Sequence, residues 1–472
     1  MTTLLQDAAL SERLHRAIEA GAVAASCRRE PVLASVSAPL PFIDPLTVFE
    51  RVVAEERAFW EQPQERFSMV AVGEAAQLTG HGIERFAQVT DAWQRLVSSA
   101  VVETADGCPV AAPVCLGGFA FDPAHDPDTA WEGYPDALLT VPKFLIISRE
   151  GSSWLIASAL VAPECNVEAE AETMLADIGA LLAQGERVPA HEESKGTIAL
   201  AEEDGAERWK EAVAAIVREI EGGAVQKLVL ARRVRARAER PLTPTTVLRR
   251  LREGYSGCTT FAFTQGAGCF LGATPERLVR LEGRSVLATA LAGSAARGAT
   301  EEEDRLLGEA LLADHKERHE HALVVEALQN TLGPLSAGLY APEQPQLLRM
   351  PIVQHLHTPG ETKLANEEHI LGLVERLHPT PAAGGLPRQA AFDLIRSYEP
   401  FHRGWYAGPV GWIDGRGGGE FVVAIRSALL REREALLYAG CGIVAESDPE
   451  REYQESALKL RPMLWAINGP ES

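Results

Sequence analysis

The sequence predicts an α+β protein, because strand-like and helical segments are mixed along the chain. Residues 155–161 form a short, mostly apolar run that is typical of a strand. Over residues 209–220, apolar side chains recur at helical spacing, and the glycine pair at 222–223 ends the predicted helix. The glycine-rich segment 414–420 predicts a hairpin turn between two apolar strands.

The same patterns place the remaining elements of the second half. Strands are expected around 260–264, 268–272, 278–282 and 286–290, a long helix over about 303–330, and a last helix from near Pro449 to about Ala466. The polar and charged stretch 187–205 predicts a loop or linker between the two parts of the chain.

The composition excludes several classes of partner. The chain has 472 residues, 46% of them hydrophobic, and carries 45 basic against 66 acidic residues for a net charge of -21. Nucleic acids and anionic membrane surfaces bind clustered positive charge, so both are disfavoured. An anionic substrate would need a local positive field, supplied by a metal or by focused Arg and Lys side chains.

Cysteine usage and hydropathy favour a cytoplasmic protein. No apolar run approaches the roughly 20 residues that span a bilayer, and the N-terminus has no basic region ahead of an apolar stretch. The seven cysteines are odd in number, widely spaced and free of any Cys-x-x-Cys pair, which indicates reduced thiols and argues against a zinc-thiolate site.

Lys227 is the first candidate for chemistry. It lies in Gln226-Lys-Leu-Val-Leu-Ala-Arg232, a predicted strand whose two faces are both largely apolar, so the lysine is expected to be buried. A lysine that loses its water can act as a base near neutral pH. Taken alone, the strand favours a structural alternative, in which Lys227 reaches solvent at the strand end or forms a salt bridge.

A pair of carboxylates lies on the predicted long helix. Glu317 and Glu320 are three residues apart and therefore share one helical face with several apolar residues. Buried carboxylates need a cation or strong donors, whereas a solvated acidic patch is the structural alternative. A zinc site using His315 and His319 is weak, because the His-Glu-x-x-His arrangement is absent.

The last helix carries a second carboxylate pair. Asp448-Pro449 is a typical helix start, and Glu452, Glu455 and Lys459 then follow on one face. Two helices that each present a glutamate pair indicate a site for a hard cation, and Mg²⁺ suits such oxygen ligands. Just upstream, the glycines at 440 and 442 would let backbone N–H groups approach an anion.

Two further charged residues follow apolar strands. Arg426 is expected to end a strand and to face a covered interior, where it could clamp a carboxylate; a surface ion pair is the alternative. Glu276 is expected in an apolar setting that would raise its pKa and suit a general acid. A salt bridge with Arg277 is its alternative.

Ten short segments of the sequence, taken together and in their order along the chain, resemble the chorismate-utilising enzymes over about residues 205–466. The matching segments are Gln226-Lys-Leu-Val-Leu-Ala-Arg, Gly272-Ala-Thr-Pro-Glu-Arg-Leu, Ala290-Leu-Ala-Gly-Ser, Glu317-Arg-His-Glu-His, Gln354-His-Leu-His-Thr, His378-Pro-Thr-Pro-Ala-Ala-Gly-Gly, Arg403-Gly-Trp-Tyr-Ala-Gly-Pro-Val-Gly-Trp, Val423-Ala-Ile-Arg, Gly440-Cys-Gly-Ile-Val and Glu452-Tyr-Gln-Glu-Ser-Ala-Leu-Lys. Lys227, which the ammonia-using branches lack, makes the chain most similar to the isochorismate synthases. His378-Pro-Thr-Pro, Glu420, Cys441 and the ending from Arg461 resemble the long menaquinone-pathway type.

The resemblance implies a single α+β domain over 1–472, with two large antiparallel sheets packed face to face and helices outside. Residues 1–200 would be a divergent part of the same core, and 205–468 the chorismate-binding catalytic region.

The resemblance also implies a mechanism and a set of residue roles. Water would add at C2 of chorismate, with Lys227 as base, while Glu276 protonates the departing C4 hydroxyl. The metal-site and substrate-binding roles would fall to these residues: Glu320 and Glu455 as Mg²⁺ ligands; Glu317 and Glu452 as support through waters; Arg426, Tyr406 and Gly442 at the enolpyruvyl carboxylate; Lys459 near the metal-side anions; and Gly293, Ser294 and His355 along the ring.

Several alternatives stay open at this point. A salicylate synthase shares the lysine and eliminates pyruvate afterwards, and an isochorismate synthase could serve a siderophore pathway. An anthranilate synthase component or a non-catalytic metal-binding protein is less well supported. The expected protein is a monomer or weak homo-oligomer that acts on chorismate with Mg²⁺ and without an obligatory glutaminase subunit.

Overall fold

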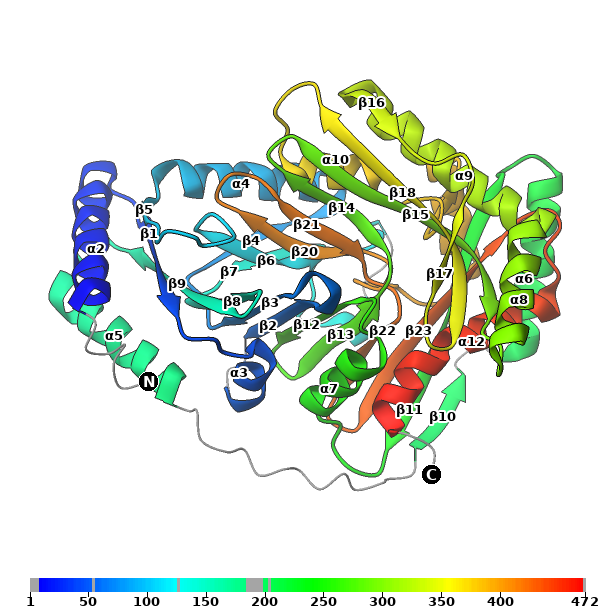
Figure 1. Cartoon of the computed structure of the whole chain (residues 1–472), viewed down its shortest axis with the longest axis horizontal. Coiled ribbons are helices and arrows are strands. Elements are labelled where there is room, and N and C mark those ends of the chain that lie inside the picture. Colours follow the sequence, from blue (N-terminus) through cyan, green and yellow to red (C-terminus); the bar gives the residue numbers. More distant parts are fainter. Residues whose placement is uncertain (1–7, 53–55, 125–127, 184–197, 203–204, 470–472) are drawn as a thin grey trace.

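Two large β-sheets dominate the computed structural model (Figure 1). The structure describes residues 8–52, 56–124, 128–183, 198–202 and 205–469. Strands from the first 200 residues and from the rest of the chain lie in both sheets.

The first sheet has 13 strands among the described residues. Apart from the parallel β1–β5 pair, its neighbouring strands are antiparallel. In spatial order they are β10 (Ile198–Glu202), β11 (Lys227–Ala238), β23 (Glu434–Ile443), β22 (Ser427–Arg431), β13 (Gly268–Thr274), β12 (Thr259–Gln265), β2 (Arg57–Gln62), β3 (Phe67–Val72), β8 (Phe144–Arg149), β9 (Ser152–Val161), β1 (Val32–Leu40) and β5 (Val101–Glu103), with β19 (Gly385–Leu386) beside β11.

The second sheet has 10 strands in the described part of the chain, and every pairing is antiparallel. In spatial order they are β16 (Ser336–Tyr340), β18 (Val353–Leu364), β15 (Ser285–Ala296), β14 (Arg277–Glu282), β21 (Gly419–Val423), β20 (Pro409–Asp414), β6 (Val114–Phe119), β7 (Ala137–Val141) and β4 (Ala76–Gly80), with β17 (Gln346–Arg349) beside β18.

Aromatic side chains join the two sheets. The rings of Phe67 on β3 and Trp412 on β20 lie 5.8 Å apart, centroid to centroid, although the two strands belong to different sheets. Trp405 is fully buried and contacts Phe263 of the first sheet. A side chain on Gly118 of β6 would collide with this indole at 2.6 Å. The main apolar core therefore runs between the sheets, as the prediction of two sheets packed face to face requires.

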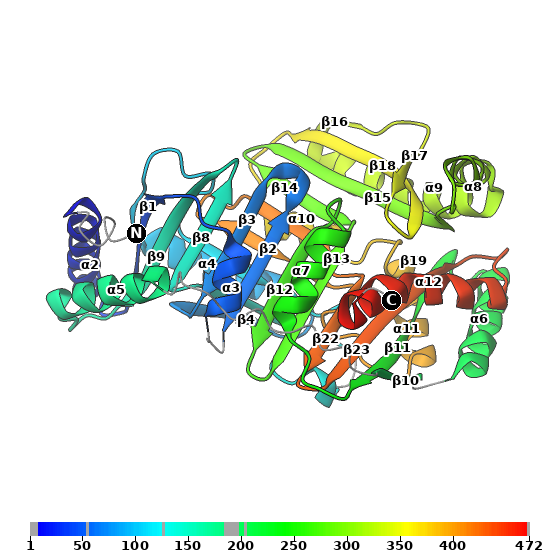
Figure 2. The ribbon, with the colours of Figure 1, turned by 60° about the horizontal axis from the view of Figure 1, so that its bottom comes forward.

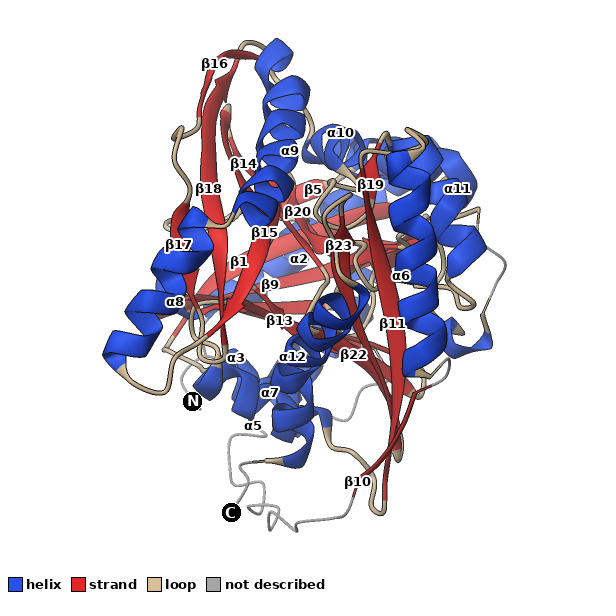
Figure 3. Cartoon of the chain, turned by 90° about the vertical axis from the view of Figure 1, so that its right-hand side faces the viewer, coloured by secondary structure: helices blue, strands red, loops and turns tan. Residues whose placement is uncertain are grey.

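Helices cover the outside of the sheets. The helices α3, α7 and α12 lie over one face of the first sheet (Figure 2), and α4, α9 and α10 contact strands of the second. Seen from the side, α9 runs along β15 while α12 lies beside β23 (Figure 3). The helices are α2 (Ala8–Arg28), α3 (Pro45–Arg51), α4 (Arg85–Ser99), α5 (Val167–Ala183), α6 (Ala206–Glu221), α7 (Pro244–Gly254), α8 (Glu301–Ala313), α9 (His315–Leu332), α10 (Ile370–Leu377), α11 (Arg388–Tyr398) and α12 (Pro449–Asn468).

The predicted long helix over 303–330 is two helices, so that prediction was wrong. Asp314 has an extended backbone (φ -66°, ψ 122°), and its carboxylate accepts a hydrogen bond from the Glu317 amide, which caps α9. The apolar stripe expected along one helix ends at this break, and Leu306 on α8 is 51% exposed. Apolar periodicity continued across Asp314 and concealed the cap.

The predicted linker over 187–205 also contains structure. Residues 198–202 form β10, which pairs with the end of β11. Residues 187–197 and 203–204 lie outside the described part of the chain. No helix among the described residues has both the length and the apolar character needed to cross a membrane.

We expect Trp405→Ala to lower the free energy of unfolding by about 3–5 kcal/mol, because it leaves a large cavity between the sheets. Denaturation in urea measures the change. Ile83→Ala is the control, since Ile83 is 84% exposed and its loss should cost less than about 0.5 kcal/mol. Equal stability of the two variants would contradict the central place of Trp405 in the core.

Candidate active site

One small cavity of about 60 Å³ brings most of the predicted site residues together. Residues from β11, β15, β18, β23, α9 and α12 and from the loop between β21 and β22 line it. Nine of the predicted residues are among its lining: Glu276, Gly293, Ser294, Glu320, His355, Tyr406, Arg426, Gly442 and Lys459. The other four do not line the cavity. Lys227, Glu317 and Glu455 contact the lining residues Glu320, Ser294 and Lys459, respectively. Glu452 contacts Lys316 on α9.

Lys227 is the first residue of β11, and its side chain is 0% exposed. The prediction of burial is confirmed, and the alternative that it reaches solvent was wrong. Its Nζ lies 3.0 Å from Glu320 Oε1 on α9, but this contact is not aligned as a hydrogen bond. The alternative that Lys227 forms a salt bridge is therefore confirmed. Its partner Glu320 lines the cavity, so the amine lies next to the cavity wall.

Gly442 on β23 makes room for this ion pair. A Cβ at this position would lie 2.1 Å from Glu320 Oε1 and 2.9 Å from Lys227 Cε. Because β11 and β23 are paired antiparallel, the backbone of Gly442 lies close to the lysine stem. Any side chain here would displace the carboxylate, so the need for glycine is steric.

Glu276 is a buried carboxyl group, 4% exposed, just before β14. Burial raises its pKa to about 7, although the positive charge of Lys227 opposes the shift. Thr380 Oγ1 donates a long hydrogen bond of 3.4 Å to its Oε1. The alternative salt bridge with Arg277 was wrong, because the Arg277 guanidinium binds Glu420 and Glu65 instead.

The alternation predicted that Arg426 ends a strand, and this prediction was wrong. Strand β21 ends at Val423, and Arg426 lies in the connection to β22 with a left-handed backbone (φ 51°). This conformation turns the chain, so the predicted strand alternation does not apply to it. Its guanidinium is buried all the same, and among the described residues it has no carboxylate partner within 4.0 Å. A buried, unpaired guanidinium beside a cavity is suited to an anionic ligand.

His355 connects Arg426 to the turn on β15. The Arg426 guanidinium donates to His355 Nε2 at 3.1 Å, so this ring nitrogen is the acceptor. His355 Nδ1 then carries the proton, 2.9 Å from Ser294 Oγ and 3.2 Å from the Gly293 carbonyl. Burial holds the pKa of His355 well below its ordinary value, so the ring is neutral. Gly293 itself has a φ of 79°, which favours glycine.

Tyr406 and Lys459 supply two more donors to the cavity. Burial raises the pKa of Tyr406 to about 12, so its hydroxyl stays protonated. Its ring stacks on Tyr438 with centroids 4.9 Å apart. Lys459 Nζ pairs with Glu455 at 2.6 Å and donates to the Gly440 carbonyl at 3.1 Å. Burial opposes the charge of Lys459, but Glu455 raises its pKa overall.

The four predicted metal-site glutamates face one another across α9 and α12, and we call them the carboxylate cluster: Glu317, Glu320, Glu452 and Glu455. A lysine that the sequence analysis did not single out lies within this cluster. Lys316 Nζ is 2.9 Å from Glu317 Oε1, 3.0 Å from Glu452 Oε1 and 3.7 Å from Glu320 Oε2. The two helices are thus tied by an ammonium group.

Two members of the cluster are ionised readily. Burial opposes the ionisation of Glu320, but Lys227 and Lys316 hold its pKa below the ordinary value. Burial likewise opposes the ionisation of Glu455, and Lys459 holds its pKa below the ordinary value. Each of these carboxylates therefore depends on a buried lysine for its charge.

The other two members resist ionisation. Burial, together with the nearby charge of Glu455, raises the pKa of Glu452 to about 7. Burial also raises the pKa of Glu317, although Lys316 opposes the shift. Both shifts arise chiefly from burial, which disfavours the charged form of each carboxyl group.

The cluster fits a hard divalent cation. Glu452 Oε2 is buried and has no hydrogen-bond partner, which leaves one carboxylate oxygen free to bind a cation. Cys441 Sγ lies near Glu452 and Glu455. Burial holds the thiol pKa well above its ordinary value, whereas the four glutamates offer oxygen ligands. Oxygen ligands alone favour Mg²⁺ over zinc.

The zinc alternative has no support among the described residues. Both His315 and His319 are exposed on α9, and neither belongs to a group of possible metal ligands among the described residues. Sequence reasoning missed Lys316 and Thr380, which touch the predicted residues directly. The sequence signal for Lys316 was its position immediately before Glu317, one of the predicted metal-site glutamates. Nothing in the local pattern at Thr380 indicated that it would reach Glu276.

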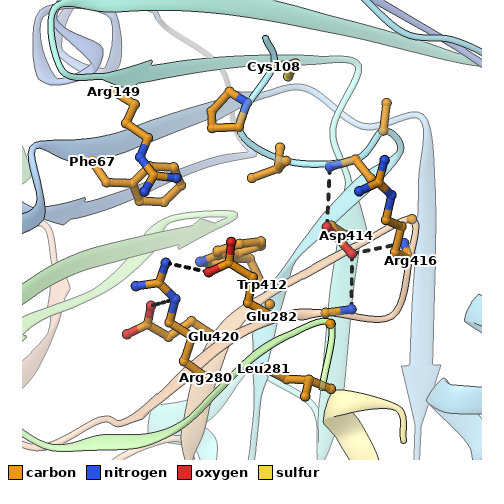
Figure 4. A pocket seen from close by; sticks show the side chains of 18 of the residues that line it. Phe67, Cys108, Arg149, Arg280, Leu281, Glu282, Trp412, Asp414, Arg416 and Glu420 are labelled. Atoms are coloured by element: carbon orange, nitrogen blue, oxygen red, sulfur yellow. Dashed lines mark hydrogen bonds and ion pairs between the residues drawn. The ribbon is translucent and has the colours of Figure 1, made fainter. Parts of the chain in front are cut away.

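A larger cavity of about 390 Å³ lies elsewhere, and none of the predicted site residues lines it (Figure 4). Its charged side chains include Arg280 and Glu420, which lie side by side with Nε and Oε2 4.0 Å apart. Glu420 is also bound by Arg277 at 2.6 Å. Because this carboxylate is already paired, the smaller cavity remains the candidate active site.

Comparison with known proteins identifies similar chains over the whole length. A family model described as "Chorismate binding enzyme" matches residues 17–468. The salicylate biosynthesis isochorismate synthase of Pseudomonas aeruginosa is 41% identical over 455 residues, covering 93% of this chain and 90% of the relative. The isochorismate synthase MenF of Bacillus subtilis is 35% identical over 477 residues, covering 99% of each chain.

Solved structures of related enzymes have the same fold. MenF, the menaquinone-specific isochorismate synthase from Escherichia coli, has a TM-score of 0.77 at 26% identity, covering 96% of this chain and 100% of that one. Anthranilate synthase component I from Streptococcus pneumoniae has a TM-score of 0.70 at 22% identity, covering 84% of this chain and 92% of that one, and so shares the fold.

We expect Gly442→Ala to push the Glu320 carboxylate away from Lys227 and to lower the free energy of unfolding by about 1–3 kcal/mol. A crystal structure of the variant and its denaturation in urea measure the two effects. Gly333→Ala is the control, because a Cβ there meets nothing within 4 Å. An unmoved Glu320 in the Gly442 variant would show that the site is looser than these contacts imply.

Proposed function

The chain belongs to the chorismate-binding enzyme family and is an isochorismate synthase, and we propose that it works by Mg²⁺-dependent addition of water at C2 of chorismate with loss of the C4 hydroxyl. The single observation that supports the mechanism is the environment of the Glu276 carboxyl group. This buried carboxyl group has a pKa of about 7 and shares its cavity with an arginine that lacks a carboxylate partner. A neutral acid beside an anion-binding group suits a dicarboxylate substrate that must lose a hydroxyl group.

Lys227 is the proposed base. In its neutral form, the Lys227 amine takes a proton from water, the water oxygen bonds to C2, the ring double bonds shift, and the C4–O bond breaks. Glu276 gives its proton to the departing hydroxyl, so one water enters and one leaves. The proton then passes from Lys227 to Glu276 through solvent, which resets both groups. Hydroxide is a poor leaving group and water a poor nucleophile, so both the acid and the base are needed.

Mg²⁺ bound to the carboxylate cluster would neutralise the ring carboxylate of chorismate in a chain with a net charge of -21. Glu320 and Glu455 would hold it directly, and Glu317 and Glu452 would support it through waters. The free Oε2 atom of Glu452 and the all-oxygen donor set support this assignment.

The remaining residues would orient the substrate. Arg426, Tyr406 and the Gly442 backbone are proposed to hold the enolpyruvyl carboxylate. Arg426 Nε has no hydrogen-bond partner, and the protonated Tyr406 lines the same cavity. Lys459 would lie near the anions on the metal side. The ring would lie along the turn formed by Gly293, Ser294 and His355.

The proposed pathway is menaquinone biosynthesis, without a glutaminase subunit. The similarity to two MenF proteins over nearly the whole chain supports it. Supply of isochorismate for salicylate is the second candidate, which the 41% identity to the Pseudomonas aeruginosa relative favours. Loss of menaquinone when the gene is deleted, restored by the wild-type gene, would separate the two; normal menaquinone content would exclude the first.

Incubation with chorismate tests the reaction itself. We expect non-aromatic isochorismate as the product and no turnover after Mg²⁺ is removed with EDTA. Liquid chromatography identifies the product, and a lactate dehydrogenase assay detects pyruvate. Fluorescent salicylate released together with pyruvate would instead establish a salicylate synthase, and no consumption of chorismate would leave a non-catalytic protein.

We expect Lys227→Gln to lower kcat by about 10²–10⁴-fold, because water loses its base. Steady-state turnover of chorismate measures the effect, and isothermal titration checks that Mg²⁺-dependent ligand binding remains. Lys210→Gln is the matched control, since Lys210 pairs with Glu207 and Glu450 at the surface. A Lys227 variant that turns over at the wild-type rate would remove this residue from the base role.

We expect Glu276→Gln to lower kcat by a similar factor of about 10²–10⁴. In the wild type, kcat should fall as the pH rises through about 7, because a general acid must be protonated and Glu276 has a pKa of about 7. A pH profile of the wild type measures this limb. Glu282→Gln at the end of β14, with a side chain 76% exposed, serves as the control. Unchanged kcat in the Glu276 variant would reject it as the acid.

A further inference from the structure

Lys316 is an internal cation of the carboxylate cluster to which the proposed reaction assigns no role. It is the second residue of α9, and its side chain is 13% exposed. Its Nζ contacts carboxylates of both helices, Glu317 and Glu320 on α9 and Glu452 on α12. It is therefore the charged group that holds the two acidic pairs together in this structure.

The other two lysines of the site have different surroundings. Lys227 pairs with Glu320 from the first strand of the site, β11, and Lys459 pairs with Glu455 and with the Gly440 carbonyl on β23. Both therefore connect the cluster to the first sheet. The ion pairs of Lys316, in contrast, are all with members of the cluster among the described residues.

The two glutamate pairs do not form one compact set of ligand atoms in the described part of the chain, and Lys316 contacts both pairs. Among the described residues, the group of three or more possible ligand atoms that lie within 4.8 Å of one another is Cys441, Glu452 and Glu455. The oxygens of Glu317 and Glu320 are not part of it. An ammonium group at 2.9–3.7 Å from oxygens of both pairs occupies the space between them.

A divalent cation held by Glu320 and Glu455 would lie close to this ammonium group, which is 3.7 Å from Glu320 Oε2 and pairs with the two supporting glutamates. Mg²⁺ binds carboxylate oxygens at about 2.0–2.1 Å, so an ammonium group this near to one of its ligands would repel it strongly. Charge balance favours exchange. Four carboxylates face three ammonium groups, and a divalent cation in place of Lys316 would balance the four charges together with Lys227 and Lys459.

We propose that Lys316 is a built-in counter-ion that Mg²⁺ displaces from the carboxylate cluster when it binds, and that Lys316 thereby sets the metal affinity of the site. The proposal rests on the proposed use of Mg²⁺. The long, flexible lysine stem and its partial exposure give the ammonium a route to solvent. Without metal, the lysine stabilises the buried carboxylates; with metal, it is released.

The test compares Lys316→Met with Lys210→Met. Lys210 also contacts α12 through Glu450, but its ion pairs lie at the surface, away from the cluster. Isothermal titration with MgCl₂ in the absence of chorismate measures the affinity. We expect Mg²⁺ to bind Lys316→Met about tenfold more tightly than the wild type, because the binding-competent state no longer has to exclude the lysine. Lys210→Met should bind Mg²⁺ as the wild type does.

Thermal unfolding supplies the second measurement. In EDTA, Lys316→Met should melt below the wild type, because the carboxylates lose a buried cation. In saturating MgCl₂ the difference should disappear. An equal loss of stability with and without Mg²⁺, together with unchanged affinity, would overturn the proposal and leave Lys316 as a tie between helices. Weaker Mg²⁺ binding would overturn it too, since the lysine would then assist the metal.

Crystal structures of the wild type provide a measurement that needs no variant. With MgCl₂, Lys316 Nζ should lie away from Glu320 and Glu452, and without it the contacts described above should remain. A lysine that keeps these contacts beside bound Mg²⁺ would overturn the proposal. Wild-type turnover of chorismate, measured in parallel, separates the two failures. Mg²⁺-dependent turnover with unchanged affinity in Lys316→Met rejects this proposal alone, whereas absence of Mg²⁺ binding to the wild type rejects both.

Discussion

The buried ion pair between Lys227 and Glu320 is the contact on which the site depends. Lys227 begins β11 in the first sheet, whereas Glu320 lies on α9, which packs against β15 of the second sheet. The pair thus joins the two layers of the fold at the cavity. Removing one partner of such a pair leaves an uncompensated buried charge, at a cost of about 3–5 kcal/mol. Gly442 is part of the same constraint, because only a residue without a side chain leaves room for both groups.

The same residue type performs different tasks around this pair, because the surroundings differ. Glu276 and Glu320 are both buried glutamates. Glu320 has a lysine at 3.0 Å, which keeps it ionised. The Glu276 carboxyl group instead accepts a long hydrogen bond from Thr380, and its pKa is about 7. Environment, and not residue identity, therefore separates an ionised carboxylate from one that holds its proton near neutral pH.

Much of the candidate site could be predicted from local patterns, because those patterns have a direct physical cause. The alternation around Lys227 predicted its burial, and the Asp448-Pro449 start of α12 put Glu452 and Glu455 on one face. The predictions failed where the backbone leaves regular structure. Asp314 caps α9 in the middle of an apolar pattern, and Arg426 lies in a left-handed turn. The division of the chain at residues 200–205 stays a prediction.

By itself, the sequence determined which chemistry is available: a lysine in an apolar strand, two glutamate pairs on helices, and the order of motifs that marks the family. It could do so because helical and strand periodicity act over a few residues. The tertiary structure alone decided which of these groups meet. Three such contacts join Lys316 to Glu452, Thr380 to Glu276 and His355 to Arg426, which are separated by 71 to 136 residues along the chain. Such contacts depend on how two sheets pack, and no local pattern records that packing.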